Sequence, residues 1–145
     1  EPGGKPINIA LQPNRCDFGP DVDALFSTLN KRAEAAVEAI EKKDFPNEEA
    51  RAAALEANAE KSQYLKVGRS FKGLMLTGIG THYEATSLYF ANSPAEVKAA
   101  FSKLGFPISA DGFVEGKEEG GASTSISATQ GEGSAYGKTE LNCGV

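Results

Sequence analysis

The chain has 145 residues, of which 40% are hydrophobic and 24% are charged, and its formal net charge at pH 7 is −5. A chain of this length can bury a core of its own, so we expect one domain over residues 1–145. No run approaches the ~20 apolar residues that span a bilayer. The lysines and arginines are dispersed, which argues against nucleic-acid binding, because phosphates are neutralised by clustered cations. A basic partner surface matches this charge better.

The two ends of the chain indicate where the protein works. It begins with Glu1 rather than Met, which fits either a trimmed chain or a mature exported protein, and we expect an exported protein whose signal sequence has been removed. Cys16 and Cys143 are the two cysteines, and they have neither a C-x-x-C spacing nor a histidine cluster beside them. We therefore expect one Cys16–Cys143 disulfide, which would stabilise by up to about 4 to 5 kcal/mol in the chain-entropy model. The alternative is two buried free thiols in a cytosolic protein.

The first half of the chain carries two helical patterns after an irregular arm. Residues 7–11 alternate apolar and polar side chains, which predicts a short edge strand. Apolar residues then recur at 3–4–3–4 spacing from Val22 to Ile40, which predicts an amphipathic helix from Pro20 or Asp21 to about Lys43. Asn47 is a suitable N-cap for a second, alanine-rich helix that runs to about Tyr64. The two helices form a predicted αα-hairpin.

The second half is mainly strand-like, with one further helix. Residues 70–79 and 82–90 are rich in β-branched and aromatic side chains, and the Gly-Thr pair at 80–81 predicts a tight turn between two strands. The segment 93–96 (SPAE) combines a capping serine, a proline at the first helical position and a capping-box glutamate, which predicts a helix at about 94–104. We therefore predict an α+β fold, in which the N-terminal αα-hairpin packs with a mainly antiparallel β-sheet and this further helix.

The stretch 112–136 is unusually rich in glycine, serine and glutamate. Segments 112–117, 123–129 and 135–142 predict three further strands, with hairpin turns at the glycines between them. The segment 123–129 is polar at nearly every position, so we expect it to face solvent or a partner rather than the core. Because Cys143 follows at once, we expect exposed hairpins held at both ends rather than a free tail.

No set of residues in the sequence specifies a reaction. His82 is the only histidine, and a pairing with Glu84 would need a pocket for acid–base chemistry. A small glycan hydrolase that uses Glu84 with Glu115 is a third alternative, because paired carboxyl groups cleave glycans. The chain has 20 acidic residues, so such a pair arises readily by chance. Neither a zinc-ligand set nor an EF-hand spacing is present. We therefore expect that the chain binds no metal or cofactor and is not an enzyme.

The candidate binding surface is the group of glycine-rich turns beside Tyr136. Glutamates on such turns offer hydrogen-bond acceptors to a basic or hydroxyl-lined cleft. A solvated loop is the simpler interpretation of residues 115–119. We expect steric and electrostatic occlusion of a partner's cleft by five residues: Ser127, Gln130, Glu132, Ser134 and Tyr136.

A mature start, one terminal disulfide and a polar hairpin tip together resemble the small periplasmic immunity proteins that bacteria pair with type VI secreted peptidoglycan-cleaving effectors, in particular the inhibitor of a muramidase effector. The resemblance rests on the general character of the chain and on segment 125–136 (SISATQGEGSAY). It implies a periplasmic protein that inserts loops into the groove of a cognate secreted toxin enzyme and blocks glycan entry.

The same resemblance implies a protein that is either soluble or lipid-anchored. An anchor would lie upstream of residue 1, because Cys16 is too far inside the chain to carry it. A homodimer is left open as a further partner. A carbohydrate- or envelope-binding module is the alternative to an inhibitor.

Overall fold

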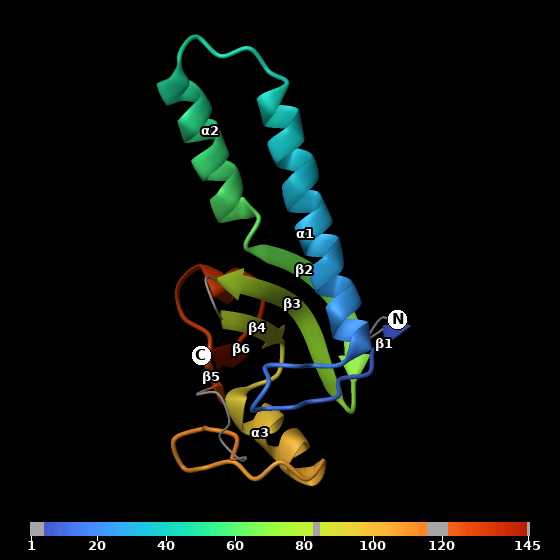
Figure 1. The fold of residues 1–145 in the computed structure, drawn as a ribbon. Helices are drawn as coiled ribbons and strands as arrows, with labels where there is room; N and C mark the ends of the chain where they lie inside the picture. The colour runs from blue at the N-terminus through green and yellow to red at the C-terminus, as the bar shows by residue number, and fades with distance from the viewer. Residues whose placement is uncertain (1–4, 83–84, 116–121, 145) are drawn as a thin grey trace.

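The computed structural model describes residues 5–82, 85–115 and 122–144. In these residues, strands form one sheet in the order β1-β2-β3-β4-β6-β5 (Figure 1). The pair β1–β2 is parallel and all other neighbours are antiparallel. The predicted α+β class is therefore confirmed. The elements are β1 (Lys5–Pro6), α1 (Pro20–Glu41), α2 (Glu48–Lys61), β2 (Tyr64–Phe71), β3 (Leu74–His82), β4 (Ala85–Phe90), α3 (Pro94–Lys103), β5 (Ser123–Ala128), the 3₁₀ helix η1 (Gly131–Ala135) and β6 (Thr139–Gly144).

Local capping groups fix where α2 and α3 begin. The Asn47 side chain accepts a hydrogen bond from the backbone N–H of Ala50 at 2.9 Å, which satisfies one of the free donors of the first turn of α2. At the start of α3, Ser93 and Glu96 form the predicted reciprocal capping box. The end of α2 is earlier than expected, because Tyr64 already belongs to β2.

The helices α1 and α2 lie beside one another and are joined by residues 42–47 (Figure 1). The start of α1 packs into the core through the buried Val22 and Leu29. In contrast, α2 has no buried residue. The exposed ion pair between Arg51 and Glu41, at 3.7 Å, contributes at most about 1 kcal/mol. The expected packing of this helical pair with the sheet therefore comes mainly from α1.

The turn between β2 and β3 lies at Lys72 and Gly73, with φ angles of 50° and 84°. Two successive residues in the left-handed region fit a two-residue hairpin turn, whose twist matches the flanking strands. The strands then pair in register from Phe71 opposite Leu74. The predicted turn at residues 80–81 is wrong, because both residues lie inside β3 and pair with β4.

The N-terminal arm forms less strand than its alternation predicted. Strand β1 ends at Pro6, and the arm then leaves the sheet. The apolar positions Ile7, Ile9 and Leu11 are nevertheless buried. The alternation therefore identified the core-facing side chains correctly, although residues 7–11 pair with no long strand.

The segment 112–117 forms no strand among its described residues, which end at Glu115. It makes the isolated bridges of Val114 with Ile108 and of Phe113 with Ser125. The segment predicted as a strand over 135–142 starts later, at Thr139, because the 3₁₀ helix η1 precedes it.

Strand β5 contributes to the core, so the expectation that 123–129 faces away from it is wrong. Thr124 and Ile126 are each only 1% exposed. The Thr124 hydroxyl can be buried because it donates a hydrogen bond to the carbonyl oxygen of Pro13 at 2.9 Å. The polar segment of β5 can thus bury one face, because the Thr124 hydroxyl has a hydrogen-bond partner there.

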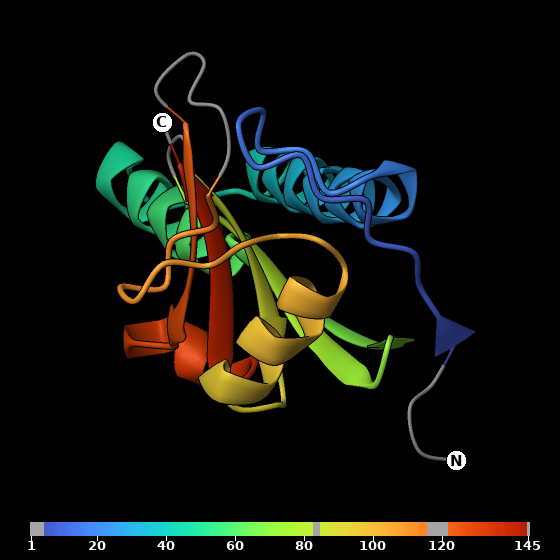
Figure 2. The ribbon, with the colours of Figure 1, turned by 90° about the horizontal axis from the view of Figure 1, so that it is seen from below.

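The core lies on the face of the sheet that α3 covers (Figure 2). The fully buried Phe101 of α3 lies with its ring centroid 6.0 Å from that of Phe71 and 6.3 Å from that of Phe90. Successive residues of a strand point to opposite faces. Tyr89 therefore projects away from the face to which Leu88 and Phe90 contribute, and it marks the second face of the sheet.

Candidate functional site

Three tyrosines meet on the second face of the sheet and form what we call the tyrosine cluster: Tyr64, Tyr89 and Tyr136. The rings of Tyr64 and Tyr136 are stacked, with centroids 4.7 Å apart and an interplanar angle of 13°. The Tyr89 ring is tilted against both, at 6.0 Å from Tyr64 and 6.3 Å from Tyr136. Such contacts contribute roughly 0.5 to 1.5 kcal/mol per pair beyond the buried area.

Two glycines of β3 make room for these rings. A Cβ atom on Gly78 would lie 2.7 Å from the Cβ of Tyr136. On Gly80 it would lie 3.1 Å from ring carbons of both Tyr64 and Tyr89. Glycine inside a strand is unfavourable by itself and indicates a close approach of another group. The rings therefore rest directly on the backbone of β3.

Backbone hydrogen bonds hold the segment that carries Tyr136. Thr129 N–H donates to the Lys138 carbonyl at 2.9 Å and closes the segment between them, which we call the η1 loop. Lys138 N–H donates to the Phe90 carbonyl at 2.8 Å. The Thr77 hydroxyl donates to the Tyr136 carbonyl. The η1 loop is thereby fixed to β3 and β4 before it meets any ligand.

The η1 loop and the end of β5 carry all five residues of the predicted binding surface. Four of them are exposed, and Tyr136 is half-buried by its stacking on Tyr64. These five residues lie within ten positions of one another in the sequence, so the chain itself brings them together. What the structure adds is that the loop carrying most of them is held by hydrogen bonds and by the stacking of Tyr136 on Tyr64. The four exposed residues are Ser127, Gln130, Glu132 and Ser134.

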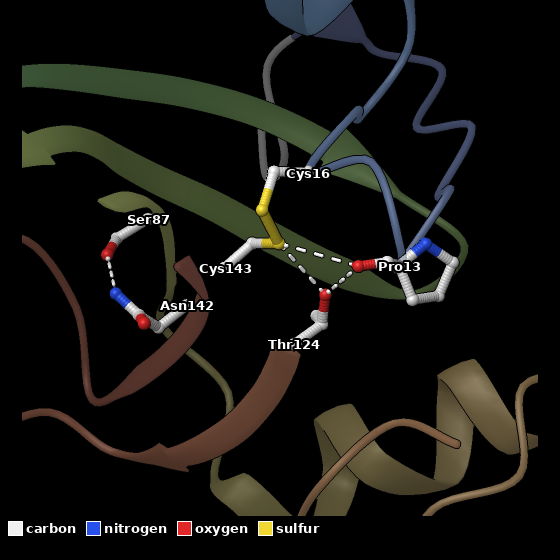
Figure 3. The surroundings of a disulfide bond; sticks show 6 residues. All are labelled: Pro13, Cys16, Ser87, Thr124, Asn142 and Cys143. Atoms are coloured by element: carbon white, nitrogen blue, oxygen red, sulfur yellow. Dashed lines mark hydrogen bonds between the residues drawn. A yellow bond between two sulfur atoms is a disulfide. The ribbon is translucent and has the colours of Figure 1, made fainter. Parts of the chain in front are cut away.

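A partly buried polar network supports the cluster from β4 and β6. The Ser87 hydroxyl donates to Glu140 Oε2 at 2.6 Å, and the Tyr89 hydroxyl donates to the same oxygen at 3.2 Å. Asn142 Nδ2 donates to Ser87 Oγ at 2.8 Å (Figure 3). Burial, followed by the negative charge of Glu140, raises the pKa of Tyr89 above its ordinary value. Tyr89 is therefore a neutral hydrogen-bond donor at neutral pH.

A pocket of about 410 Å³ opens beside the tyrosine cluster, between the end of α2 and η1. His82 Nδ1 lies 3.3 Å from Gln63 Oε1 within it. Burial, followed by the charge of Glu132, raises the pKa of Tyr64. We call it the acidic pocket, and its described lining residues are Glu56, Ala59, Glu60, Gln63, Tyr64, His82 and Glu132.

The acidic pocket offers carboxylate and amide oxygens beside an aromatic ring, which suits a cationic or hydrogen-bond-donating group. Among residues 5–82, 85–115 and 122–144, no group of three or more histidine, cysteine, aspartate or glutamate side chains has the geometry to hold a metal ion. The carboxylate pair of the hydrolase alternative is not described, because Glu84 lies outside the described residues. Its second member, Glu115, is exposed.

The predicted disulfide between Cys16 and Cys143 is present, with the Cα atoms 5.3 Å apart. It ties the N-terminal arm to β6, beside the Thr124–Pro13 hydrogen bond (Figure 3). Cys143 is fully buried. A disulfide is compatible with an oxidising compartment. No helix in the described part of the chain is both long and apolar enough to cross a membrane.

The pocket and most of the tyrosine cluster could not be predicted from the sequence. The cluster joins residues from three distant segments, and no local pattern connects them. One signal was available: Gly78 and Gly80 alternate within a strand-like run, which indicates that another group packs closely on one face.

No family model matches this sequence, no curated protein matches it, and no solved structure matches its fold. Functional inference therefore rests on the geometry of the tyrosine cluster, the η1 loop and the acidic pocket.

Proposed function

We propose that the chain is a periplasmic inhibitor, an immunity protein that binds a cell-wall-degrading effector enzyme and occludes its substrate groove, and that it is not itself an enzyme. The observation that carries the proposal is the η1 loop, an exposed polar segment fixed by hydrogen bonds at both ends. Exposed polar side chains on a rigid support are what an occluding surface requires.

Preorganisation is the physical reason for this preference. Ordering a flexible loop on binding costs roughly 0.5 to 1.5 kcal/mol for each immobilised side chain, and a loop already held in place avoids part of that cost. Ser127, Gln130, Glu132 and Ser134 supply hydroxyl, amide and carboxylate groups that can replace the hydrogen bonds of a polysaccharide in a groove. Tyr136 supplies apolar area at their base.

The charge and the disulfide also support the proposal. A net charge of −5 favours a partner with a basic surface, because complementary charge speeds association and restricts the choice of partner. The Cys16–Cys143 disulfide fits an exported protein. The periplasm is an oxidising compartment, and it is also where an enzyme that acts on the cell wall would meet the chain.

The test is affinity purification with the oxidised chain as bait in a periplasmic extract, followed by an enzyme assay on the captured protein. We expect a peptidoglycan-cleaving enzyme whose activity on purified peptidoglycan falls when the chain is added. The pair Glu132→Ala with Tyr136→Ala should abolish capture, whereas Glu38→Ala with Lys42→Ala on α1 should retain it. Equal capture by both pairs contradicts the proposal.

A carbohydrate- or envelope-binding module is the second candidate. The stacked rings of Tyr64 and Tyr136 favour it, because an aromatic face beside hydrogen-bonding groups is typical of small-ligand sites. Retention of purified peptidoglycan by the chain, without any captured protein, would support this candidate over the inhibitor.

A further inference from the structure

Four separate elements build the acidic pocket: α2, β2, β3 and η1. Glu56 and Glu60 lie one helical turn apart on α2, Glu132 comes from η1, and His82 ends β3. Tyr64 lines the pocket, and its position is fixed because its ring stacks on Tyr136. The tertiary fold, rather than an acidic run in the sequence, brings these carboxylates to one pocket.

The described lining of the pocket is acidic. Three of its described lining residues are glutamates, and none of the described lining residues is lysine or arginine. Burial and, after it, the charge of Glu132 raise the pKa of Tyr64. The described lining therefore combines acidic side chains with an aromatic side chain that is held by stacking.

A second pocket, on α1, has carboxylates but no aromatic side chain among its described lining residues. It has a volume of about 400 Å³ and is lined by Ala33, Glu34, Val37 and Glu38. It has two glutamates but no aromatic ring, and all its residues come from one helix. The chain thus contains its own control for charge without an aromatic wall.

We infer that the acidic pocket receives one lysine or arginine side chain of the protein partner, an inference that rests on the proposed function. The cation lies over the Tyr64 ring, where the ring quadrupole attracts it in a cation–π contact. Glu60 and Glu132 accept its hydrogen bonds, and an arginine can engage a carboxylate through two parallel N–H groups. The η1 loop occludes the partner's groove while this pocket anchors a basic residue at the rim of that groove.

The experiment is an NMR titration of the oxidised, ¹⁵N-labelled full chain with Nα-acetyl-arginine amide at low salt. The neutral citrulline analogue, which keeps the shape and lacks the charge, is the control. We expect saturable shifts at Gln63, His82 and Glu132 with the arginine probe and none with citrulline.

Variants of the chain separate the pocket from general surface charge. Glu132→Gln should raise the apparent dissociation constant about two- to five-fold, the effect of losing one exposed charge pair. Glu38→Gln, which removes the same charge from the α1 pocket, should leave it unchanged. Tyr64→Phe should retain binding and Tyr64→Leu should weaken it about two- to five-fold.

Three outcomes would overturn the inference: equal shifts at Glu34 and Glu38, equal shifts with citrulline, or shifts in the pocket with an N-acetylglucosamine oligomer instead of the arginine probe. The proposed function fails separately. Suppose that the arginine probe does not bind, but the Glu132→Ala with Tyr136→Ala variant still fails to capture the enzyme. The pocket inference is then wrong, and the inhibitor proposal stands.

Discussion

The ring of Tyr136 stacks on the ring of Tyr64, with centroids 4.7 Å apart and planes inclined by 13°. This contact ties the η1 loop to the start of β2, at the junction with α2. The polar tip that we propose as the working surface is therefore coupled mechanically to the sheet and to the acidic pocket beside it.

The close approach of Tyr136 to β3 predicts that Gly78→Ala destabilises the protein. The added Cβ would lie 2.7 Å from the Cβ of Tyr136, and relieving such overpacking costs about 1 to 3 kcal/mol. Urea unfolding measures the loss. Gly68→Ala is the matched control, because its Cβ would meet nothing within 4 Å, and we expect it to stay within about 0.5 kcal/mol of wild type. Equal losses for both variants would contradict the packing described for the cluster.

The disulfide predicts a large difference between oxidised and reduced protein. The bond joins Cys16 to Cys143 across a sequence separation of 127, and losing a bridge of this kind costs about 2 to 5 kcal/mol. Urea unfolding with and without reductant should show it, and the double variant Cys16→Ala with Cys143→Ala should match the reduced protein. Unfolding midpoints that do not change on reduction would show that the bond adds no stability.

Sequence reasoning succeeded where the cause of a feature is local. The capping groups at Asn47 and Ser93 determine helix starts through their own hydrogen bonds, so the SPAE pattern was sufficient. It failed at the β2–β3 turn, because Lys72 adopts a positive φ that its residue type does not predict. The burial of Thr124 also depends on a distant partner, the Pro13 carbonyl.

The candidate site was predictable only in part, because some of its features have local causes and others depend on contacts between distant segments. The exposed polar residues of the η1 loop follow from composition, and the disulfide follows from two cysteines near opposite ends. The tyrosine cluster and the acidic pocket need the sheet order, which places β2, β3 and β4 side by side and brings η1 over them. That order is a non-local property, and no pattern in a single segment carries it.

The buried hydroxyl of Tyr89 predicts a loss of stability at alkaline pH. Its folded-state pKa is raised above the ordinary value of 10.0, so its contribution is fully present below pH 10 and is lost as pH rises beyond it. Tyr89→Phe should therefore show a smaller alkaline decrease in the free energy of unfolding than wild type. Chemical unfolding at pH 8 to 11 measures the difference. Parallel decreases in the two proteins would contradict the assignment.

The capping box of α3 predicts a loss of stability as pH falls, in contrast to the alkaline loss predicted for Tyr89. The Ser93 N–H donates to Glu96 Oε1 at 3.0 Å, and this bond is the main cause that lowers the pKa of Glu96. Its stabilising effect is present above the ordinary glutamate pKa and is lost as pH falls through the lowered value. The stability advantage of wild type over Glu96→Gln should thus shrink as pH drops below about 4. Glu38→Gln, on the exposed face of α1, should show no comparable trend.

The most direct test of the central claim is the inhibition constant of the chain against the captured enzyme. Glu132→Ala with Tyr136→Ala should raise this constant by about 30-fold or more, as for hot-spot residues, and Gln130→Ala with Glu132→Ala should raise it without touching the tyrosine stack. Glu38→Ala with Lys42→Ala should change it less than about three-fold. Equal constants for the loop and helix variants, all folded by thermal unfolding, would contradict the claim that the η1 loop is the working surface.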